Sequence, residues 1–164
     1  MQFLILILVL SLQNILAGQI EQQPSSTDSE GNCTNCTKCP PNDPKSNKAF
    51  VLKAYQEILG DHNFTNLEQY FHEDYIQHNP HAAEGREGLR AFVKSVPEGP
   101  QKIDFKRTVA EDDFVWVHVR MTSFNTSWAI VDIFRIECGK IKEHWDVLQD
   151  TKLQKKAANE HQFF

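Results

Sequence analysis

Apolar and polar residues alternate along two segments in the second half of the chain, as expected for strands of which one face is buried. The alternation is clear over residues 114–123 and 128–137, and looser over 103–111 and 141–148. Residues 138–140 separate two of these segments and have the composition of a tight hairpin turn. This half of the chain is therefore predicted to form an antiparallel meander.

The residues before these strands show helical spacing instead. Apolar side chains recur every three or four positions over 51–58 and again over 89–96. Ser46 or Asn47 is expected to cap the first of these helices. A short helix is predicted between them, because residues 65–68 match a capping box. Helices followed by strands predict an α+β fold, in which the helices pack on one side of a single curved antiparallel sheet.

The first eighteen residues differ in kind from the rest. Residues 2–12 are almost entirely apolar, and no charged side chain precedes Glu21. Such a run is too short for a transmembrane helix of about 20 residues, and it matches the apolar region of a secretory signal. We interpret residues 1–18 as a cleaved signal peptide, with an uncleaved anchor as the alternative, and expect no stable membrane insertion after cleavage.

Residues 19–46 are rich in small polar residues, so they are expected to form a flexible linker before a folded domain over 47–150 and a tail over 151–164. The linker holds three of the four cysteines. Zinc would need a fourth nearby ligand and redox chemistry a strand–helix context, so disulfides are the favoured interpretation. The pairing stays open, and the candidates are Cys33, Cys36, Cys39 and Cys138.

Four Asn-x-Ser/Thr sequons favour a secretory route, because this pattern is the acceptor for N-glycosylation. They begin at Asn32, Asn35, Asn63 and Asn125. The chain of 164 residues has 17 basic and 22 acidic residues, a formal net charge of −5. A mildly acidic chain lacks the basic surface of a nucleic-acid-binding protein. The sequence therefore predicts a secreted, extracellular glycoprotein without a nucleic-acid partner.

Asp132 is the most informative residue, because it stands in the middle of an otherwise apolar strand face. A buried carboxylate is unfavourable unless it is paired. Burial also raises the pKa of a carboxyl group toward neutral pH, which suits a general acid or base. The alternative is a purely structural carboxylate. If the flanking strands pair symmetrically about Asn125, His118 lies opposite Asp132. A two-residue loop would put the two side chains on opposite faces, but the exposed sequon favours the longer loop.

Other side chains are expected to line a pocket around Asp132. The candidates for ligand contact are Tyr75, His78, Trp116, Trp128, Phe134 and His144. Gln77 and Asp146 are further polar residues of the same segments, although alternation alone does not show which face is concave. No phosphate-binding glycine loop and no nucleophilic serine elbow is present in the sequence. A metal triad of His78, His118 and His144 is an alternative, but we expect no metal and no cofactor.

Three motifs, in order along the chain, resemble those of a known family. They are Tyr75-Ile-Gln-His-Asn-Pro80 with Gly85-Arg-Glu-Gly-Leu89, then Ala129-Ile-Val-Asp132-Ile-Phe-Arg135, then Gly139-Lys-Ile-Lys-Glu-His-Trp-Asp146-Val-Leu-Gln149. Together they resemble the SnoaL-like, polyketide-cyclase-like members of the nuclear transport factor 2-like superfamily, over about residues 47–150.

The resemblance implies a cone of helices and curved sheet around a hydrophobic pocket, and a homodimer. Family cyclases close a ring by aldol condensation without metal or cofactor, and the matching residues here are Asp132 as the acid–base residue and His118 as its assistant. Two functions are expected: a cofactor-free cyclase, lyase or isomerase acting on a small apolar carbonyl compound, or a secreted protein that binds a small hydrophobic ligand without turnover. A third expected function is that of a structural or interaction module that is tethered to other chains through its cysteines.

Overall fold

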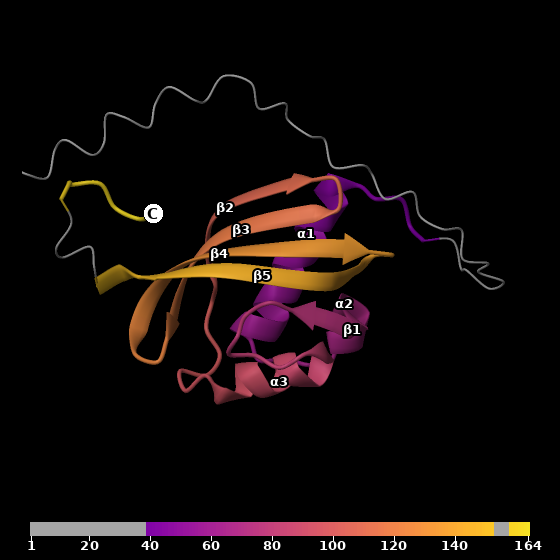
Figure 1. The fold of residues 1–164 in the computed structure, drawn as a ribbon, viewed down its shortest axis with the longest axis horizontal. Coiled ribbons are helices and arrows are strands. Elements are labelled where there is room, and N and C mark those ends of the chain that lie inside the picture. Colours follow the sequence, from indigo (N-terminus) through magenta and orange to yellow (C-terminus); the bar gives the residue numbers. More distant parts are fainter. Residues whose placement is uncertain (1–38, 153–157) are drawn as a thin grey trace, which may run out of the picture. The chain divides into compact units, whose positions relative to one another are not determined.

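The computed structural model describes residues 39–152 and 158–164. The predicted signal peptide and most of the linker lie outside the described residues, and so do four candidates: Asn32, Cys33, Asn35 and Cys36. Within the described residues, no helix combines the length and the apolar character needed to cross a bilayer. The expected α+β fold is confirmed, since one curved five-stranded sheet has helices packed on its inner side (Figure 1).

The strands of the sheet lie in the order β1-β5-β4-β3-β2. Their bounds are β1 (Phe71–Gln77), β2 (Asp104–Glu111), β3 (Phe114–Ser123), β4 (Thr126–Glu137) and β5 (Lys140–Asp150). Strands β2 to β5 form the predicted antiparallel meander. The expectation of an entirely antiparallel sheet is wrong at one edge, because β1 pairs parallel with β5. This pairing brings the segment that ends at Gln77 alongside the last strand.

Four helical elements of the described residues come before β2. They are α1 (Pro44–Tyr55), the π-helical turn η1 (Gln56–Gly60), α2 (Leu67–Tyr70) and α3 (Gly85–Ser95). Helix α1 begins inside the predicted linker, since Asp43, and not Ser46 or Asn47, caps it. The Asp43 carboxylate accepts the Ser46 N–H at 2.9 Å. The capping box predicted before α2 is also wrong, because the residue that precedes this helix makes no side-chain cap hydrogen bond.

The inner face of the sheet carries the apolar core. Val115, Val117 and Val119 of β3 are fully buried, as their alternation predicted. Helix α1 contacts β2 and β3, while α3 contacts β1. Val51 of α1 and Ile58 of η1 are buried against this face as well. The two helices therefore cover opposite parts of the same concave surface, with β4 and β5 between them.

The connection between β3 and β4 has two residues, which is shorter than the loop that the sequence predicts. Phe124 and Asn125 both have positive φ angles, of 50° and 56°, as the tightest hairpin turns require. Ser123 pairs with Thr126 across the turn. The Asn125 N–H also donates to the Glu98 carboxylate from outside the hairpin. Asn125, the acceptor residue of the sequon, is exposed as expected, but it lies on a turn that sets a different register.

This register overturns a central prediction. Val117 pairs with Asp132, and His118 pairs with Val131. Because successive side chains of a strand point to opposite faces, a shift of one residue moves His118 to the outer face of the sheet. The predicted pairing of His118 with Asp132 is therefore wrong, and the partner of Asp132 comes from another strand.

Replacing Phe124 by asparagine is expected to stabilise the protein by about 0.5–1 kcal/mol, because asparagine tolerates the left-handed backbone that a bulky residue adopts only under strain. The exposed Phe124 ring loses little packing. Urea unfolding of unglycosylated protein measures the effect, since the change also creates an Asn-x-Thr sequon. Phe124→Leu is the control: an equal gain with leucine would contradict the backbone explanation.

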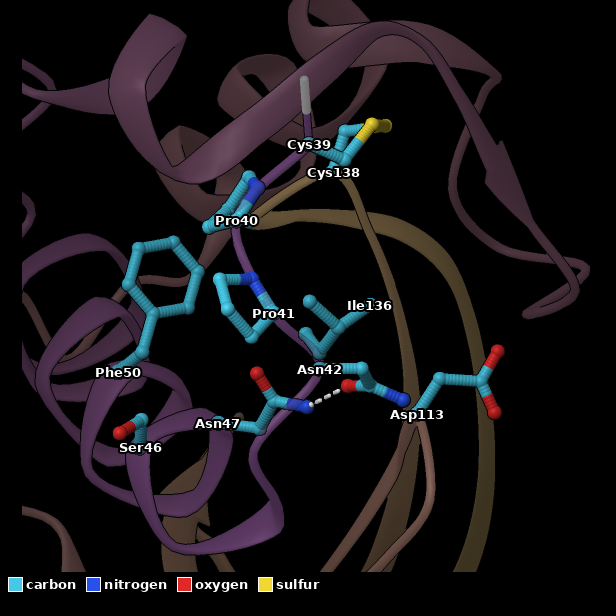
Figure 2. Close-up of a pocket in the computed structure, with 11 residues that line it drawn as sticks. Cys39, Pro40, Pro41, Asn42, Ser46, Asn47, Phe50, Asp113, Ile136 and Cys138 are labelled. Carbon is cyan, nitrogen blue, oxygen red and sulfur yellow. Dashed lines mark hydrogen bonds between the residues drawn. A yellow bond between two sulfur atoms is a disulfide. The ribbon is translucent and has the colours of Figure 1, made fainter.

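A disulfide joins Cys39 to Cys138, 99 residues apart in sequence. Cys138 and Gly139 form the two-residue turn between β4 and β5, with φ angles of 46° and 75°. Pro40 follows the disulfide and lies beside this turn (Figure 2). Among the pairings that the sequence left open, the structure thus contains Cys39 with Cys138, which fastens the chain before α1 to the end of a hairpin.

Candidate functional site

Asp132 lies on the inner face of β4 and is only 4% exposed. Its carboxylate has two polar partners from different elements. The Tyr55 hydroxyl, at the end of α1, donates to Oδ2 at 2.9 Å. His144 Nε2, on β5, lies 3.0 Å from Oδ1. The buried carboxylate expected from the strand pattern is therefore present, and both of its oxygens are engaged.

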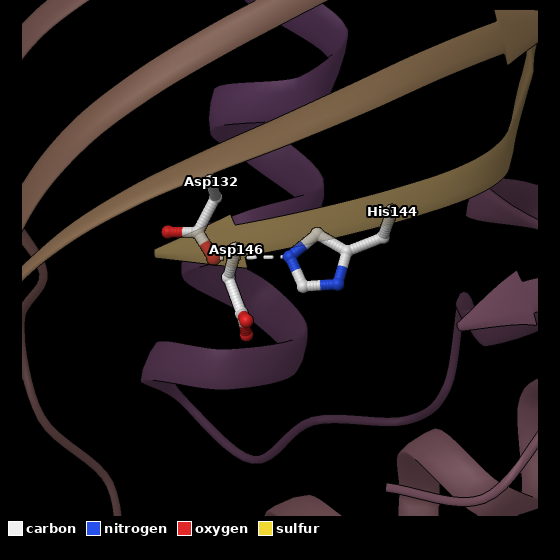
Figure 3. Close-up of side chains that lie close together, drawn as sticks. All are labelled: Asp132, His144 and Asp146. Carbon is white, nitrogen blue, oxygen red and sulfur yellow. Dashed lines mark hydrogen bonds and ion pairs between the residues drawn. The ribbon is translucent and has the colours of Figure 1, made fainter. Parts of the chain in front are cut away.

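The pairing of β4 with β5 assembles this group. Asp132 pairs directly with Asp146, and Phe134 pairs with His144, so the imidazole reaches Asp132 diagonally across the two strands (Figure 3). The Asn79 side-chain amide donates to Asp146 Oδ2. Two carboxylates directly opposite each other on paired strands repel and destabilise a sheet. Two carboxylates that face the inside of the protein are more typical of a functional site than of a structural core.

Gln77 determines which nitrogen of His144 carries hydrogen. Its Oε1 atom accepts the backbone N–H of Asn79 at 2.9 Å. A backbone N–H can only donate, so the atom that it meets is the carbonyl oxygen of the Gln77 amide. The same oxygen lies 2.9 Å from His144 Nδ1. Nδ1 is therefore protonated and donates to Gln77, and Nε2 is the nitrogen that faces Asp132.

One proton is consequently shared between His144 and Asp132. The short contact from Nε2 to Oδ1 needs one hydrogen, held either by the imidazole or by the carboxyl group. The first arrangement is an ion pair and the second a neutral pair, and both have the same total charge. Without this proton, two lone pairs would face each other in a buried place. The pair is thus a buried proton donor and acceptor.

Two tyrosine hydroxyls complete the polar part of the site. Tyr55 stands where α1 changes into the π-helical turn η1, a local distortion that is frequent at functional sites. Burial, the charge of Asp132 and the hydrogen bond to it raise the pKa of the Tyr55 hydroxyl well above its ordinary value. Burial and the charges of Asp132 and Asp146 raise the pKa of Tyr75 in the same way. Both hydroxyls therefore stay protonated and can donate.

These polar groups open into a cavity of about 70 Å³ between the sheet and the helices. At roughly 10–15 Å³ for each enclosed water, the cavity accommodates about five to seven small atoms or groups. Its polar lining consists of Tyr55, Tyr75, Gln77, Asn79, Asp132, His144 and Asp146. Its apolar lining is larger and includes Phe71, Leu89, Phe92, Met121, Ile130 and Phe134. The site is therefore a small apolar cavity with one polar wall.

The structure brings three of the predicted contact residues to this cavity: Tyr75, Phe134 and His144. His118 lies on the outer face instead, with its Nδ1 3.0 Å from the guanidinium of Arg107. Burial and the charges of Arg107 and Lys106 lower the pKa of His118. The position predicted for His118, next to Asp132, is occupied by His144.

Three further predicted contacts also lie away from the cavity. The His78 ring stacks on Trp145, with centroids 4.6 Å apart, and its Nε2 lies 2.8 Å from the Glu143 carboxylate. Trp116 is 48% exposed on the outer face of β3. Trp128 packs against the core, and its indole N–H donates to a backbone carbonyl at the end of β3, 3.2 Å away. Because alternate side chains of a strand point to opposite faces, a known register would have placed some of these residues on the face opposite to Asp132.

Sequence reasoning missed Tyr55 and Asn79. Tyr55 belongs to the apolar stripe of a helix, where an aromatic residue is normally part of the core, and nothing local indicates that its hydroxyl reaches a carboxylate. Asn79 belongs to the first motif that carried the family resemblance, so a signal was available. The sequence indicates Gln77 and Asp146 as polar residues of the same segments but does not assign them to the inner face. Their roles become visible only when β1 lies beside β5.

Asp132, His144 and Asp146 present possible ligand atoms within 4.8 Å of one another, close enough to hold a metal ion. A proton already lies between His144 and Asp132, so a cation would have to displace it. The alternative triad considered from the sequence is not assembled, because His78 and His118 lie on the outer face while His144 points inward.

A second, more open hollow of about 350 Å³ lies beside the disulfide (Figure 2). Its lining includes Pro40, Pro41, Phe50 and a pair of asparagines, of which Asn47 donates to Asn42. Apart from the bonded cysteines, Asp113 is the titratable residue of this lining. The hollow holds no acid–base pair, so the cavity at Asp132 is the candidate functional site.

Comparison with known proteins gives a family and a fold. The model of the SnoaL-like domain family matches residues 52–144 of the chain. No curated protein matches the sequence. A candidate SnoaL-like polyketide cyclase from Jannaschia sp. CCS1 has a similar structure, with a TM-score of 0.56 and 21% identity over 68% of this chain and 91% of that one.

Two other solved structures share the fold. A candidate ketosteroid isomerase from Kribbella flavida DSM 17836 has a TM-score of 0.57 and 19% identity, over 66% of this chain and 81% of that one. A nuclear transport factor 2-like protein of unknown function from Burkholderia xenovorans LB400 has a TM-score of 0.56 and 15% identity, over 72% of this chain and 98% of that one. Identities this low show the common fold and no more.

Proposed function

This chain belongs to the SnoaL-like domain family, and we propose that it is a cofactor-free acid–base catalyst that moves a proton next to the carbonyl group of a small, mostly apolar compound. The reaction class is that of an isomerase, a lyase or an aldol cyclase. The observation that carries the proposal is the buried Asp132 carboxylate, which shares a proton with His144 at the wall of an apolar cavity.

In the proposed reaction, Asp132 in its ionised form removes a proton from the carbon beside the carbonyl group. The negative charge then develops on the substrate oxygen and needs a hydrogen-bond donor. Tyr75 accepts a hydrogen bond from the Gln77 amide at 3.1 Å, so its own hydrogen can be donated to that oxygen. Because the site is buried, these hydrogen bonds act in a medium that screens charge weakly.

Hydrogen exchange in deuterium oxide tests the proposal without knowledge of the natural substrate. Butanone is small enough for the cavity, and proton NMR follows the loss of its hydrogens next to the carbonyl group. We expect these hydrogens to exchange faster with the protein than in buffer at the same pH. If butanone and a panel of aldehydes and ketones of similar size all exchange at the buffer rate, proton abstraction is not the function.

The apolar lining also favours a second function, in which the protein binds a small hydrophobic ligand without turnover. Most of the cavity wall is aromatic or aliphatic and makes no polar contact. Native mass spectrometry of protein purified from its own source distinguishes the two. A co-purified ligand that is released chemically unchanged, together with no exchange of butanone, would favour binding alone.

A homodimer is proposed on the outer face of the sheet. Val109, Trp116, Ile133 and Trp145 are successive partners across four strands, and the first two of these side chains are 62% and 48% exposed. An exposed apolar row of this kind supports association with a second copy. The mass of the assembly in the same native spectra decides between one copy and two.

Secretion is proposed on the signal-like start of the chain, the four sequons and the disulfide. Bonds such as Cys39–Cys138 persist in oxidising compartments. Asn63 and Asn125 are both exposed, so a glycosyltransferase can reach them. Expression in a eukaryotic cell is expected to yield protein in the medium that loses mass on treatment with an N-glycosidase. Retention in the cell, or an unchanged mass, would contradict the proposal.

A further inference from the structure

Asp146 is an acidic side chain that has no ion-pair partner in the described part of the chain. Its Oδ2 atom accepts a hydrogen bond from the uncharged Asn79 amide, and no ion pair of the described residues includes it. The side chain lines the cavity next to the Asp132–His144 bond (Figure 3). No lysine or arginine belongs to the described lining of this cavity. A partly buried carboxylate without a cationic partner is electrostatically unfavourable.

The total charge of the site follows from the hydrogen bonds. Since Gln77 requires a hydrogen on His144 Nδ1, the pair of His144 and Asp132 is neutral in total, whichever of the two holds the shared proton. Asp146 then leaves the cavity with one net negative charge.

We infer that the cavity binds a ligand with a positively charged amino group, which lies against Asp146 while the apolar part of the ligand contacts the aromatic wall. The inference rests on the proposed function only in taking this cavity as the binding site. Together they define the substrate class as a small compound that carries both an amino and a carbonyl group. The carbonyl part then faces Asp132, and the ammonium neutralises the remaining charge.

An ammonium group suits the surroundings of Asp146 better than a metal ion does. A metal ion requires four or more ligand atoms, but the clustered side chains are three, and most of the remaining wall is apolar. An ammonium needs only a few acceptors and also interacts favourably with aromatic faces. The lining of the cavity includes aromatic side chains, among them Phe71, Phe92 and Phe134. A bound metal is nevertheless a distinguishable outcome of the test.

Binding of three probes of nearly equal size tests the inference. Isobutylamine is a cation at neutral pH, isobutanol is neutral and isobutyrate is an anion, and each can be titrated into the folded protein and followed by NMR. We expect isobutylamine to bind about tenfold or more tightly than isobutanol, and isobutyrate to bind most weakly. Equal affinity for the amine and the alcohol would overturn the inference, and so would preference for the anion.

Two charge-neutralising variants locate the effect. Asp146→Asn is expected to lower the affinity for isobutylamine about tenfold and to leave isobutanol unchanged. Asp112→Asn is the matched control, because Asp112 is exposed on the β2–β3 turn at a φ of 48° that asparagine tolerates, and it should change neither affinity. If Asp112→Asn loses the preference for isobutylamine and Asp146→Asn keeps it, the assignment of the cation site to Asp146 is wrong. The comparison of probes in the unmodified protein holds even if the Asp146 variant fails to fold.

The outcomes separate this inference from the proposed function. Exchange of butanone without preference for the amine overturns the cation site and leaves the acid–base function in place. Preference for the amine without butanone exchange supports the cation site and argues against catalysis. If Zn²⁺ binds at one equivalent and isobutylamine does not bind, the three clustered side chains form a metal site and the inference is wrong.

Discussion

Replacing Asp132 by asparagine is expected to slow the exchange of butanone hydrogens by about 100- to 10,000-fold, the usual contribution of a positioned general base. Asparagine has almost the same shape as aspartate and can still accept the hydrogen bond from Tyr55. The asparagine amide cannot take up the substrate proton, and it cannot share a proton with His144 as the carboxylate does. The measurement is the first-order rate of exchange by proton NMR at a fixed pH, with buffer as the baseline.

The structure supplies a matched control for this prediction. Asp112→Asn makes the same chemical change on an exposed turn, away from the cavity, and should leave the rate unaltered. Circular dichroism of both variants checks that the fold is kept. A rate in Asp132→Asn within a factor of two of the unmodified protein, with the fold intact, would show that Asp132 is a structural carboxylate, as its alternative interpretation holds.

Removing the disulfide by Cys39→Ser with Cys138→Ser is expected to lower the free energy of unfolding by about 2–5 kcal/mol. The bond closes a loop of 99 residues, and the loss of chain entropy in the unfolded state is about 4.7 kcal/mol for a loop of about 100 residues. The bond also holds the start of α1 beside the β4–β5 turn. Urea unfolding of the oxidised protein and of the double variant measures the difference.

The other two cysteines of the linker provide the control for the disulfide. A variant in which Cys33 and Cys36 are replaced by serine keeps the Cys39–Cys138 bond and should unfold like the unmodified protein. If this variant is destabilised and the Cys39–Cys138 variant is not, another pairing carries the stabilisation. A loss below about 1 kcal/mol in the double variant would mean that the unfolded chain gains little freedom when the bond is removed.

Much of the fold could be predicted because it depends on local patterns. The bounds of β3 are those expected from alternation, and β4, β5 and α3 differ from expectation by a few residues. The inward direction of Asp132 also follows from its own strand, since its neighbours at two-residue spacing are apolar. A buried charge in such a row is visible without any knowledge of partners.

The partners of Asp132 could not be predicted, because they depend on how strands and helices meet. The predicted register of β3 and β4 is the first error. Phe124 and Asn125 adopt left-handed backbone angles that shorten the loop, and the shorter loop moves His118 to the other face of the sheet. The parallel pairing of β1 with β5 cannot be seen in either strand alone, yet it brings Gln77 to His144. These contacts join positions 67 residues apart.

The sequence by itself determined the class of fold, the family resemblance and the presence of one inward carboxylate, because periodicity and short motifs are properties of neighbouring residues. Only the tertiary structure decided that His144, and not His118, shares a proton with Asp132, that Tyr55 donates to it, and that Asp146 is left without a counter-charge. Hydrogen bonds and charge balance depend on distances across elements. The chemistry of this site is therefore set by the packing of β1, β5 and α1 around one residue of β4.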